Sequence, residues 1–288
     1  MNLTRLTARF GPEVAVWYRS LPALVDCLAR RWDLDVGEAG GGGTSCVYRC
    51  VREGRTVWLK LTPDPVIATE EAEALRAWAG SDAVVGLLDQ DLSVGALLLA
   101  GVEPGARVKE SGWRLREVGA LLAELRTAPY RSAPDLRPLA DRITFLYDMA
   151  ARRGGRDPEA LDRGRRAALE MARSGPARGL VHGDLHPANV LLGPGGRLVA
   201  IDPRPTLGDP DYDAVDWVLE GVTDEGELIA RSAELAALVP GMSAERVLGW
   251  CRATAPLTAD APEFLTSSLD RERDGRARHY SRCGTRPA

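Results

Sequence analysis

The chain has 288 residues, 45% hydrophobic and 27% charged, which is enough apolar material for one large domain or two modest ones. Its formal net charge of −4, with arginines interspersed among acids, gives no reason to expect a nucleic-acid partner. No segment reaches the roughly 18 uninterrupted apolar residues of a membrane-spanning helix, and the first residues lack a signal-peptide core. We therefore expect a cytoplasmic globular protein without a membrane partner.

The five cysteines are scattered and include no C-x-x-C pair. Cys46 and Cys50, four residues apart on a predicted strand, would share one face of it. Two ligands alone do not complete a tetrahedral zinc site. We expect neither a structural metal nor a disulfide framework.

The amino-terminal part begins with helical spacing over residues 12–31, where Pro22 is best placed in the first turn of a second short helix. Residues 34–62 then read as strand, glycine tract, strand, Glu53-Gly54 turn and strand. A capped helix is predicted over 68–80, and short apolar runs follow at 83–88 and 96–102. Because 101–107 reads as a linker, we place a lobe boundary near residue 102.

The remainder, residues 103–288, is predicted to be mostly helical around one central hairpin. Helical periodicity covers 111–127, 136–152 and 157–173, and further helices are expected between about 211 and 257. The tail from about residue 271 is charged and nearly free of aliphatic residues, so we expect it to be flexible. The sequence thus predicts an α+β protein, with a small β-rich lobe at 1–102 and a larger helical lobe at 103–288.

The densest motif of the chain is LVHGDLHPANVLLGPGGRLVAIDPRP, at residues 180–205. An apolar run enters a turn that holds Asp184, and Asn189 follows five positions later. Two short strands joined by a glycine-rich turn then end on Asp202. This pattern delivers three polar side chains to one end of a hairpin.

Those three side chains suit phosphoryl transfer. The reaction needs a carboxylate for the proton of the attacking hydroxyl, which Asp184 can supply, and oxygen ligands for Mg²⁺, which Asn189 and Asp202 can supply. The step from Asp184 to Asn189 is that of the kinase pattern H-R-D-x-x-x-x-N, with Gly183 in place of arginine. A lone His-Gly-Asp would be an ordinary turn, but the whole combination favours catalysis. His182 is better explained by packing or loop hydrogen bonds, as is His186.

The amino-terminal lobe offers groups that suit ATP. Lys60 is one of only two lysines and stands in the strand TVWLKL, where its ammonium could reach the α and β phosphates; otherwise it is a solvent-facing edge lysine. The glycine tract could bring backbone amides to phosphate, although a plain hairpin loop fits it as well. The strand at 97–101 could link the lobes and offer backbone groups to adenine. The nucleotide candidates are Lys60, Gly41, Gly42, Gly43, Thr44, Ser45, Leu99 and Ala100.

The motif residues, with Ile201-Asp202-Pro203 and the segment GDPDYD at 208–213, resemble the aminoglycoside phosphotransferase family, in its streptomycin 6-phosphotransferase and hydroxyurea phosphotransferase branch. The resemblance covers most of the chain and implies a two-lobed protein-kinase-like fold, with ATP and Mg²⁺ as cofactors and antibiotic resistance as the role. It implies that Asp184 is the base, that Asn189 and Asp202 hold magnesium, and that Asp213 braces the loop. His182 is then a fixed part of that loop. The resemblance favours Glu71 as the partner of Lys60, with Glu70 and Glu73 as competitors.

The acceptor side is marked by an acidic segment, residues 209–227, which contains no lysine or arginine. Such a segment suits a cationic acceptor, with Asp209 and Asp211 as the expected contacts, but acids at a helix start also serve as dipole partners. Tyr212 and Trp217 are expected to be core residues. By resemblance the first acceptor is streptomycin, at its 6-hydroxyl, and the second is hydroxyurea or another small hydroxylated metabolite. A non-catalytic nucleotide-binding protein of kinase fold, which recruits a partner protein, is the alternative from another class.

Overall fold

The computed structural model describes residues 3–41, 44–128, 136–175, 179–258 and 264–265. Internal contacts divide the chain into two compact units. The sheet unit consists of residues 1–112 and 188–205, and the helical unit of 113–187 and 206–288. This division differs from the expected single boundary near residue 102, because 103–112 and the hairpin at 188–205 pack with the amino-terminal part. The predicted flexible tail lies outside the described residues.

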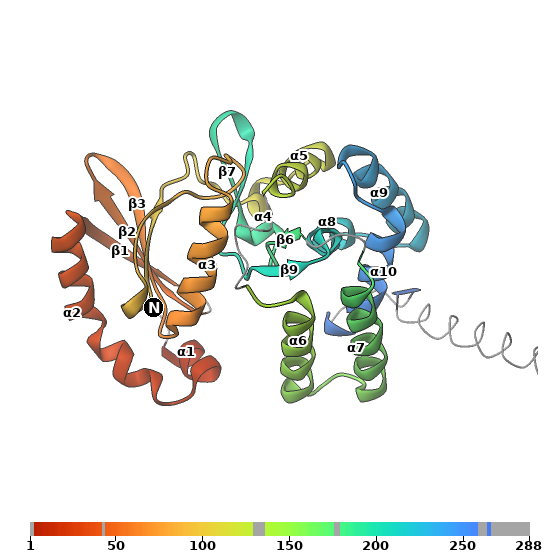
Figure 1. Ribbon diagram of the computed structural model, residues 1–288, viewed down its shortest axis with the longest axis horizontal. Coiled ribbons are helices and arrows are strands. Elements are labelled where there is room, and N and C mark those ends of the chain that lie inside the picture. Colours follow the sequence, from red (N-terminus) through yellow and green to blue (C-terminus); the bar gives the residue numbers. More distant parts are fainter. Residues whose placement is uncertain (1–2, 42–43, 129–135, 176–178, 259–263, 266–288) are drawn as a thin grey trace, which may run out of the picture. The chain divides into compact units, whose positions relative to one another are not determined.

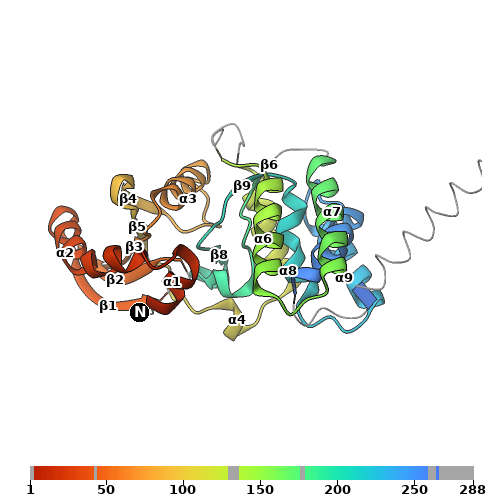
Figure 2. The ribbon, with the colours of Figure 1, turned by 90° about the horizontal axis from the view of Figure 1, so that it is seen from below.

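The sheet unit is built on a five-stranded antiparallel sheet of order β1-β2-β3-β5-β4. Helices α1 and α2 pack on one face and α3 lies on the other (Figures 1 and 2). A separate two-stranded hairpin, β7–β8, completes the unit. The elements are α1 Leu3–Phe10, α2 Val14–Trp32, β1 Asp35–Gly41, β2 Cys46–Arg52, β3 Arg55–Leu61, α3 Pro65–Ala77, β4 Leu87–Asp91, β5 Ala96–Ala100, α4 Val108–Ser111, β7 Val190–Leu192 and β8 Leu198–Ala200.

Strand alternation and turn chemistry explain how the sheet is organised. Glu53 and Gly54 both have positive φ, 53° and 73°, as the two-residue turn between β2 and β3 requires. In β3, Leu59 and Leu61 join the apolar core with α1 and α2. Since side chains alternate along a strand, Lys60 between them points to the face that α3 covers. Burial of the two leucines thereby fixes the direction of the lysine.

One helix differs from its prediction. Pro22 does not start a second short helix but lies inside α2, which runs unbroken through it. The buried residues Leu21, Val25, Leu28 and Trp32 anchor one stripe of α2 to the sheet, whereas Pro22 is exposed. Tertiary packing along that stripe compensates for the hydrogen bond that proline removes.

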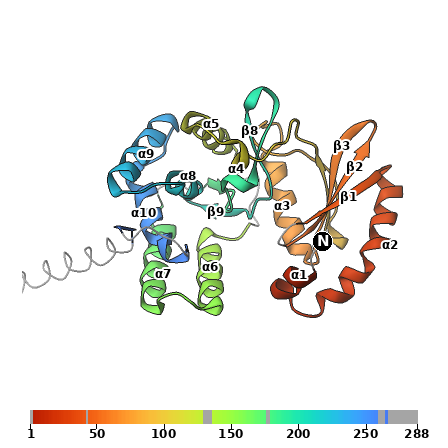
Figure 3. The same ribbon diagram turned by 180° about the vertical axis from the view of Figure 1, so that it is seen from behind.

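The helical unit packs α6 against α7, and α10 against α7 and α9 (Figure 3). The short strands β6 and β9 pair antiparallel within it, and the loop that contains Asp184 follows β6 directly. None of the described helices of the protein is long and apolar enough to cross a membrane. The elements of the unit are α5 Leu115–Leu125, α6 Leu139–Arg153, α7 Pro158–Arg173, β6 Gly179–Val181, β9 Thr206–Gly208, α8 Val215–Leu219, α9 Glu225–Leu238 and α10 Ala244–Thr254.

Candidate functional site

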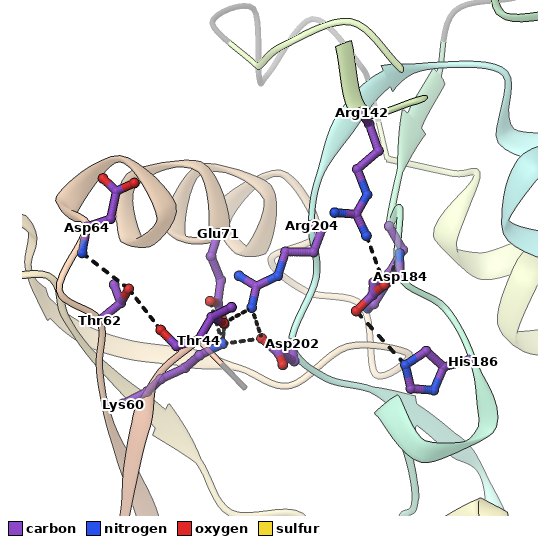
Figure 4. Close-up of polar contacts among 11 residues, drawn as sticks. Thr44, Lys60, Thr62, Asp64, Glu71, Arg142, Asp184, His186, Asp202 and Arg204 are labelled. Atoms are coloured by element: carbon purple, nitrogen blue, oxygen red, sulfur yellow. Dashed lines mark hydrogen bonds and ion pairs between the residues drawn. The ribbon is translucent and has the colours of Figure 1, made fainter. Parts of the chain in front are cut away.

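In the sheet unit, Lys60 lies at the centre of a buried ionic cluster (Figure 4). Its Nζ donates to Glu71 Oε1 at 2.7 Å and Oε2 at 2.5 Å, and to Asp202 Oδ1 at 2.7 Å. The exposed side-chain fraction is 6% for Lys60 and 1% for Glu71. Of the three expected carboxylates it is therefore Glu71, on α3, that contacts Lys60, and the lysine is not a solvent-facing one.

The cluster keeps Lys60 charged. Burial by itself would lower the pKa of Lys60, but the adjoining Asp202 and Glu71 carboxylates outweigh it and hold that pKa above its ordinary value. Asp202 remains 32% exposed and has a left-handed backbone, with φ of 56°. Such a backbone is uncommon for a residue other than glycine, although aspartate adopts it more readily than most residues. Asp202 is thus only partly covered by the protein.

Asn189 and Asp202 fit a magnesium ion by their chemistry. Asn189 lies at the start of β7, Asp202 follows β8, and the backbone O of Asn189 accepts a hydrogen bond from Ile201 N at 2.9 Å. That bond brings the two residues to the same end of the hairpin, as predicted. Both side chains are partly exposed and carry the hard oxygen donors that Mg²⁺ prefers.

The structure describes the glycine tract up to Gly41 and again from Thr44. Gly41 ends β1 opposite Cys46, and Ser45 is buried. Thr44 O accepts a hydrogen bond from Thr62 Oγ1, and Thr44 Oγ1 accepts one from Arg204 Nη2. The remaining candidates of the tract, Gly42 and Gly43, lie outside the described residues.

The expected adenine contacts on β5 are largely engaged in the sheet. Leu99 lies opposite Trp58 of β3 and Leu87 of β4, so strands flank it on both sides. The N–H of Ala100 donates to Gly86 O at 2.8 Å. That N–H is therefore not available to adenine, because the sheet already uses it.

In the helical unit, a buried carboxylate holds the loop that carries Asp184. Asp213 Oδ2 accepts from His182 N at 2.7 Å, and its Oδ1 accepts from Gly183 N at 2.9 Å. Gly183 has φ of 76°, which explains why glycine stands where the kinase pattern has arginine. Burial raises the pKa of Asp213 to about 7, although the two backbone N–H groups lower it in part. Asp213 and the buried His182 thus shape the loop.

Asp184 is also held from α6, by an arginine that sequence reasoning missed. Arg142 Nη2 donates to Asp184 Oδ1 at 2.9 Å, and Arg142 Nε donates to Gly183 O at 3.1 Å (Figure 4). His186 Nε2 lies 4.0 Å from Asp184 Oδ2. The side chain of Asp184 remains 34% exposed and lines a pocket of about 180 Å³. A small molecule in that pocket could meet this carboxylate.

The acidic segment is organised differently from the expectation. Asp209 is buried and pairs with Arg246 at 2.5 Å and with the indole N–H of Trp250 at 2.8 Å. Asp211 is buried and pairs with Arg126 at 2.5 Å. Their burial and internal partners give these carboxylates a structural role in place of the expected acceptor contact.

Two acids of the segment line the pocket, the buried Asp213 and the exposed Asp216 of α8. As expected, Trp217 is fully buried. Tyr212 is half-buried and packs edge-on against Trp250, but it also lines the pocket.

Sequence reasoning also missed Arg204, whose Nη2 lies 3.3 Å from Asp202 Oδ1. Its position two residues after a candidate metal ligand was a signal that could have identified it. Arg142 gave no such signal, because it lies in an ordinary amphipathic helix 42 positions from Asp184.

Comparison with known proteins identifies the family of the chain. The profile of the family described as aminoglycoside/hydroxyurea antibiotic resistance kinase matches residues 31–261. Streptomycin 6-kinase of Streptomyces glaucescens is 31% identical over 84% of this chain and 82% of its own length. Hydroxyurea phosphotransferase of Kitasatospora aureofaciens is 33% identical over 86% of this chain and 75% of its own length.

Solved structures share the fold at low sequence identity. The choline kinase LicA from Streptococcus pneumoniae is 16% identical, with a TM-score of 0.59 over 88% of this chain and 92% of its own. A thermostable mutant of the aminoglycoside phosphotransferase APH(4)-Ia, in a ternary complex with ADP and hygromycin B, is 15% identical, with a TM-score of 0.55 over 85% of this chain and 96% of its own. The predicted α+β, protein-kinase-like fold is confirmed. The chain belongs to the aminoglycoside/hydroxyurea antibiotic resistance kinase family and is a small-molecule kinase.

Proposed function

We propose that the protein transfers the terminal phosphoryl group of ATP, with Mg²⁺, to a hydroxyl of a small cationic acceptor in the cytoplasm. The observation that carries this proposal is the buried contact of Lys60 with both Glu71 and Asp202. A desolvated ammonium is costly to bury unless carboxylates surround it. A buried lysine beside the partly exposed Asp202 is better explained by the binding of phosphates than by a contribution to stability alone.

The nucleotide groups come from the sheet unit. Lys60, oriented by Glu71, would hold the α and β phosphates, and backbone amides of the glycine tract would cover them. Asn189 and Asp202 would hold Mg²⁺, which neutralises and orients the phosphates when bound. Enzymes of this class accelerate transfer mainly by positioning and by electrostatic stabilisation.

The acceptor groups come from the helical unit. Asp184 would orient the attacking hydroxyl and accept its proton. Asp213 fixes the loop through two backbone N–H groups, and Arg142 fixes one oxygen of the Asp184 carboxylate. The other oxygen, Oδ2, lies 4.0 Å from His186 Nε2.

The 6-hydroxyl of streptomycin is the acceptor that we propose first. Streptomycin 6-kinases align over most of this chain, and the exposed Asp216 in the pocket suits a guanidinium-bearing ring. Hydroxyurea is the second candidate, because a pocket of about 180 Å³ is small beside the roughly 300–1,000 Å³ typical of drug-sized ligands. A pocket of that size would admit all of hydroxyurea but only one ring of an aminoglycoside.

An ADP-release assay over streptomycin, other aminoglycosides, hydroxyurea and simple alcohols tests this proposal. We expect Mg²⁺-dependent ADP release with streptomycin, above the rate without an acceptor, and phosphate on the 6-hydroxyl. Release with hydroxyurea alone would select the second candidate. If the protein binds Mg²⁺–ATP but releases ADP with no member of the panel, it is a nucleotide-binding protein and the proposal is wrong.

A further inference from the structure

Arg204 occupies a distinctive position in the sheet unit, between the glycine tract and Asp202 (Figure 4). Its Nη2 donates to Thr44 Oγ1, the first described residue after the tip of the tract, and lies 3.3 Å from Asp202 Oδ1. Lys60 Nζ donates to that same oxygen at 2.7 Å. Two cations therefore converge on one carboxylate oxygen, although one cation would satisfy its charge.

The guanidinium of Arg204 is only partly used. Its Nη1 is buried and has no hydrogen-bond partner in the described part of the chain. The side chain as a whole is 15% exposed. A buried donor without an acceptor costs free energy comparable to a lost hydrogen bond, so its persistence calls for an acceptor that the described residues do not supply.

The charges in the cluster indicate that the missing acceptor is an anion. Lys60 and Arg204 carry two positive charges, and Glu71 and Asp202 carry two negative ones. The cluster is neutral by itself, and Lys60 with Glu71 is already a complete pair. Arg204 is the cation that remains when Asp202 serves a metal ion, and its planar fork of donors matches the oxygens of a phosphate.

We propose that Arg204 binds the terminal phosphate of the nucleotide, an assignment that rests on the function proposed above. Lys60 is there assigned to the α and β phosphates, and Asp202 would hold a metal ion that neutralises the charge of the phosphates. A guanidinium that shares the Asp202 oxygen has the γ-phosphate as its remaining partner. In the free protein, Thr44 Oγ1 and Asp202 hold Arg204 in place for it.

The test compares two nucleotides in one variant. In Arg204→Gln we expect calorimetric titration with Mg²⁺ to show the affinity for a non-hydrolysable ATP analogue falling about 10- to 100-fold, the size of one lost charged hydrogen-bonding contact. Affinity for ADP stays at the wild-type value, because ADP lacks the γ-phosphate. Arg204→Lys keeps the charge but not the planar set of donors, so its affinity for the ATP analogue relative to ADP should lie between those of the wild type and Arg204→Gln. It replaces Arg204→Gln if that variant does not fold.

Arg49→Gln is the matched control. Arg49 Nη2, in the same unit, also donates to a threonine hydroxyl, Thr56 Oγ1 at 3.1 Å, and Arg49 has no part in the site. That variant should bind both nucleotides as the wild type does. If affinity fell equally for both nucleotides in the Arg204 variants, Arg204 would have a structural role only. If affinity fell for neither, Arg204 would not contact the nucleotide. Each result overturns the assignment. If the wild-type protein binds neither nucleotide, it is the proposed function that fails.

Discussion

The two sets of functional groups are stabilised in opposite ways. In the sheet unit, Lys60 and Glu71 are almost fully buried, and charge neutralises charge at 2.5–2.7 Å. In the helical unit, Asp184 is 34% exposed, and its orientation comes from backbone contacts to Asp213 and from one arginine, Arg142. The first set resembles a preformed binding core, whereas the second is a supported loop beside a pocket.

This contrast indicates where each unit is sensitive to substitution. Loss of a partner in the buried cluster leaves an uncompensated charge in a medium of low dielectric constant. Loss of a support around Asp184 leaves the side chain in contact with water, so the fold tolerates it while the geometry of the reaction does not. We therefore expect a loss of stability from substitution in the first set, and a loss of rate from substitution of Arg142 in the second.

The largest stability effect should follow Glu71→Gln. The substitution keeps the size of the side chain but leaves buried Lys60 with Asp202 alone, and we expect the free energy of unfolding to fall by about 3 kcal/mol. Urea denaturation of the wild type and the variant measures this difference in the free energy of unfolding. In the same unit, Asp82→Asn breaks the exposed Arg197–Asp82 pair at 2.8 Å and should change stability little. Similar losses in both variants would remove the distinction between a buried core and the surface.

Arg142→Ala should act on the rate. Without the guanidinium, one oxygen of Asp184 loses its anchor, and we expect kcat to fall about 10- to 100-fold with little change in the KM for ATP. Added guanidinium ion should restore part of the rate. Arg165→Ala removes a comparable pair with Asp148, at 2.9 Å between α7 and α6, and should leave kcat unchanged. An unchanged kcat in Arg142→Ala would show that the arginine does not position the base.

Asp213 should give a dependence of stability on pH. Its pKa is about 7 in the folded protein against 3.8 as the ordinary value, so between these pH values the folded state binds the extra proton. The contribution to stability is complete below about pH 4 and is lost as the pH rises through about 7, by up to about 1.4 kcal/mol per pH unit. Asp213→Asn cannot titrate there and should lack this slope in urea denaturation. If the free energy of unfolding depended on pH in the same way in both proteins, the pKa of Asp213 would not be raised.

Local patterns in the sequence were enough to predict the three successive strands around Lys60, the β7–β8 hairpin and the fold class. The scarcity of lysine drew attention to Lys60 without deciding between a buried and a solvent-facing side chain, and the five-residue step identified Asp184 and Asn189 as candidates. The partner of Lys60 was harder, because Glu70, Glu71 and Glu73 lie on one helix and only its rotation against the sheet selects Glu71.

Long-range pairing explains the misses. Asp209 and Asp211 looked like acceptor contacts because they are acidic, yet Arg246 and Arg126 reach them from 37 and 85 positions away. Arg142 likewise reaches Asp184 from a helix whose periodicity shows only that it is amphipathic. Sequence spacing does not encode contacts that tertiary packing alone creates.

The central claim is that Asp202 serves the metal–nucleotide complex while Asp184 serves the transfer step. The direct test measures Mg²⁺-dependent ATP binding and acceptor-dependent ADP release in Asp184→Asn and Asp202→Ala. We expect Asp184→Asn to bind Mg²⁺–ATP as the wild type does while its turnover falls about 10²- to 10⁴-fold, and Asp202→Ala to lose the Mg²⁺-dependent part of binding. Unchanged turnover in Asp184→Asn would contradict the account.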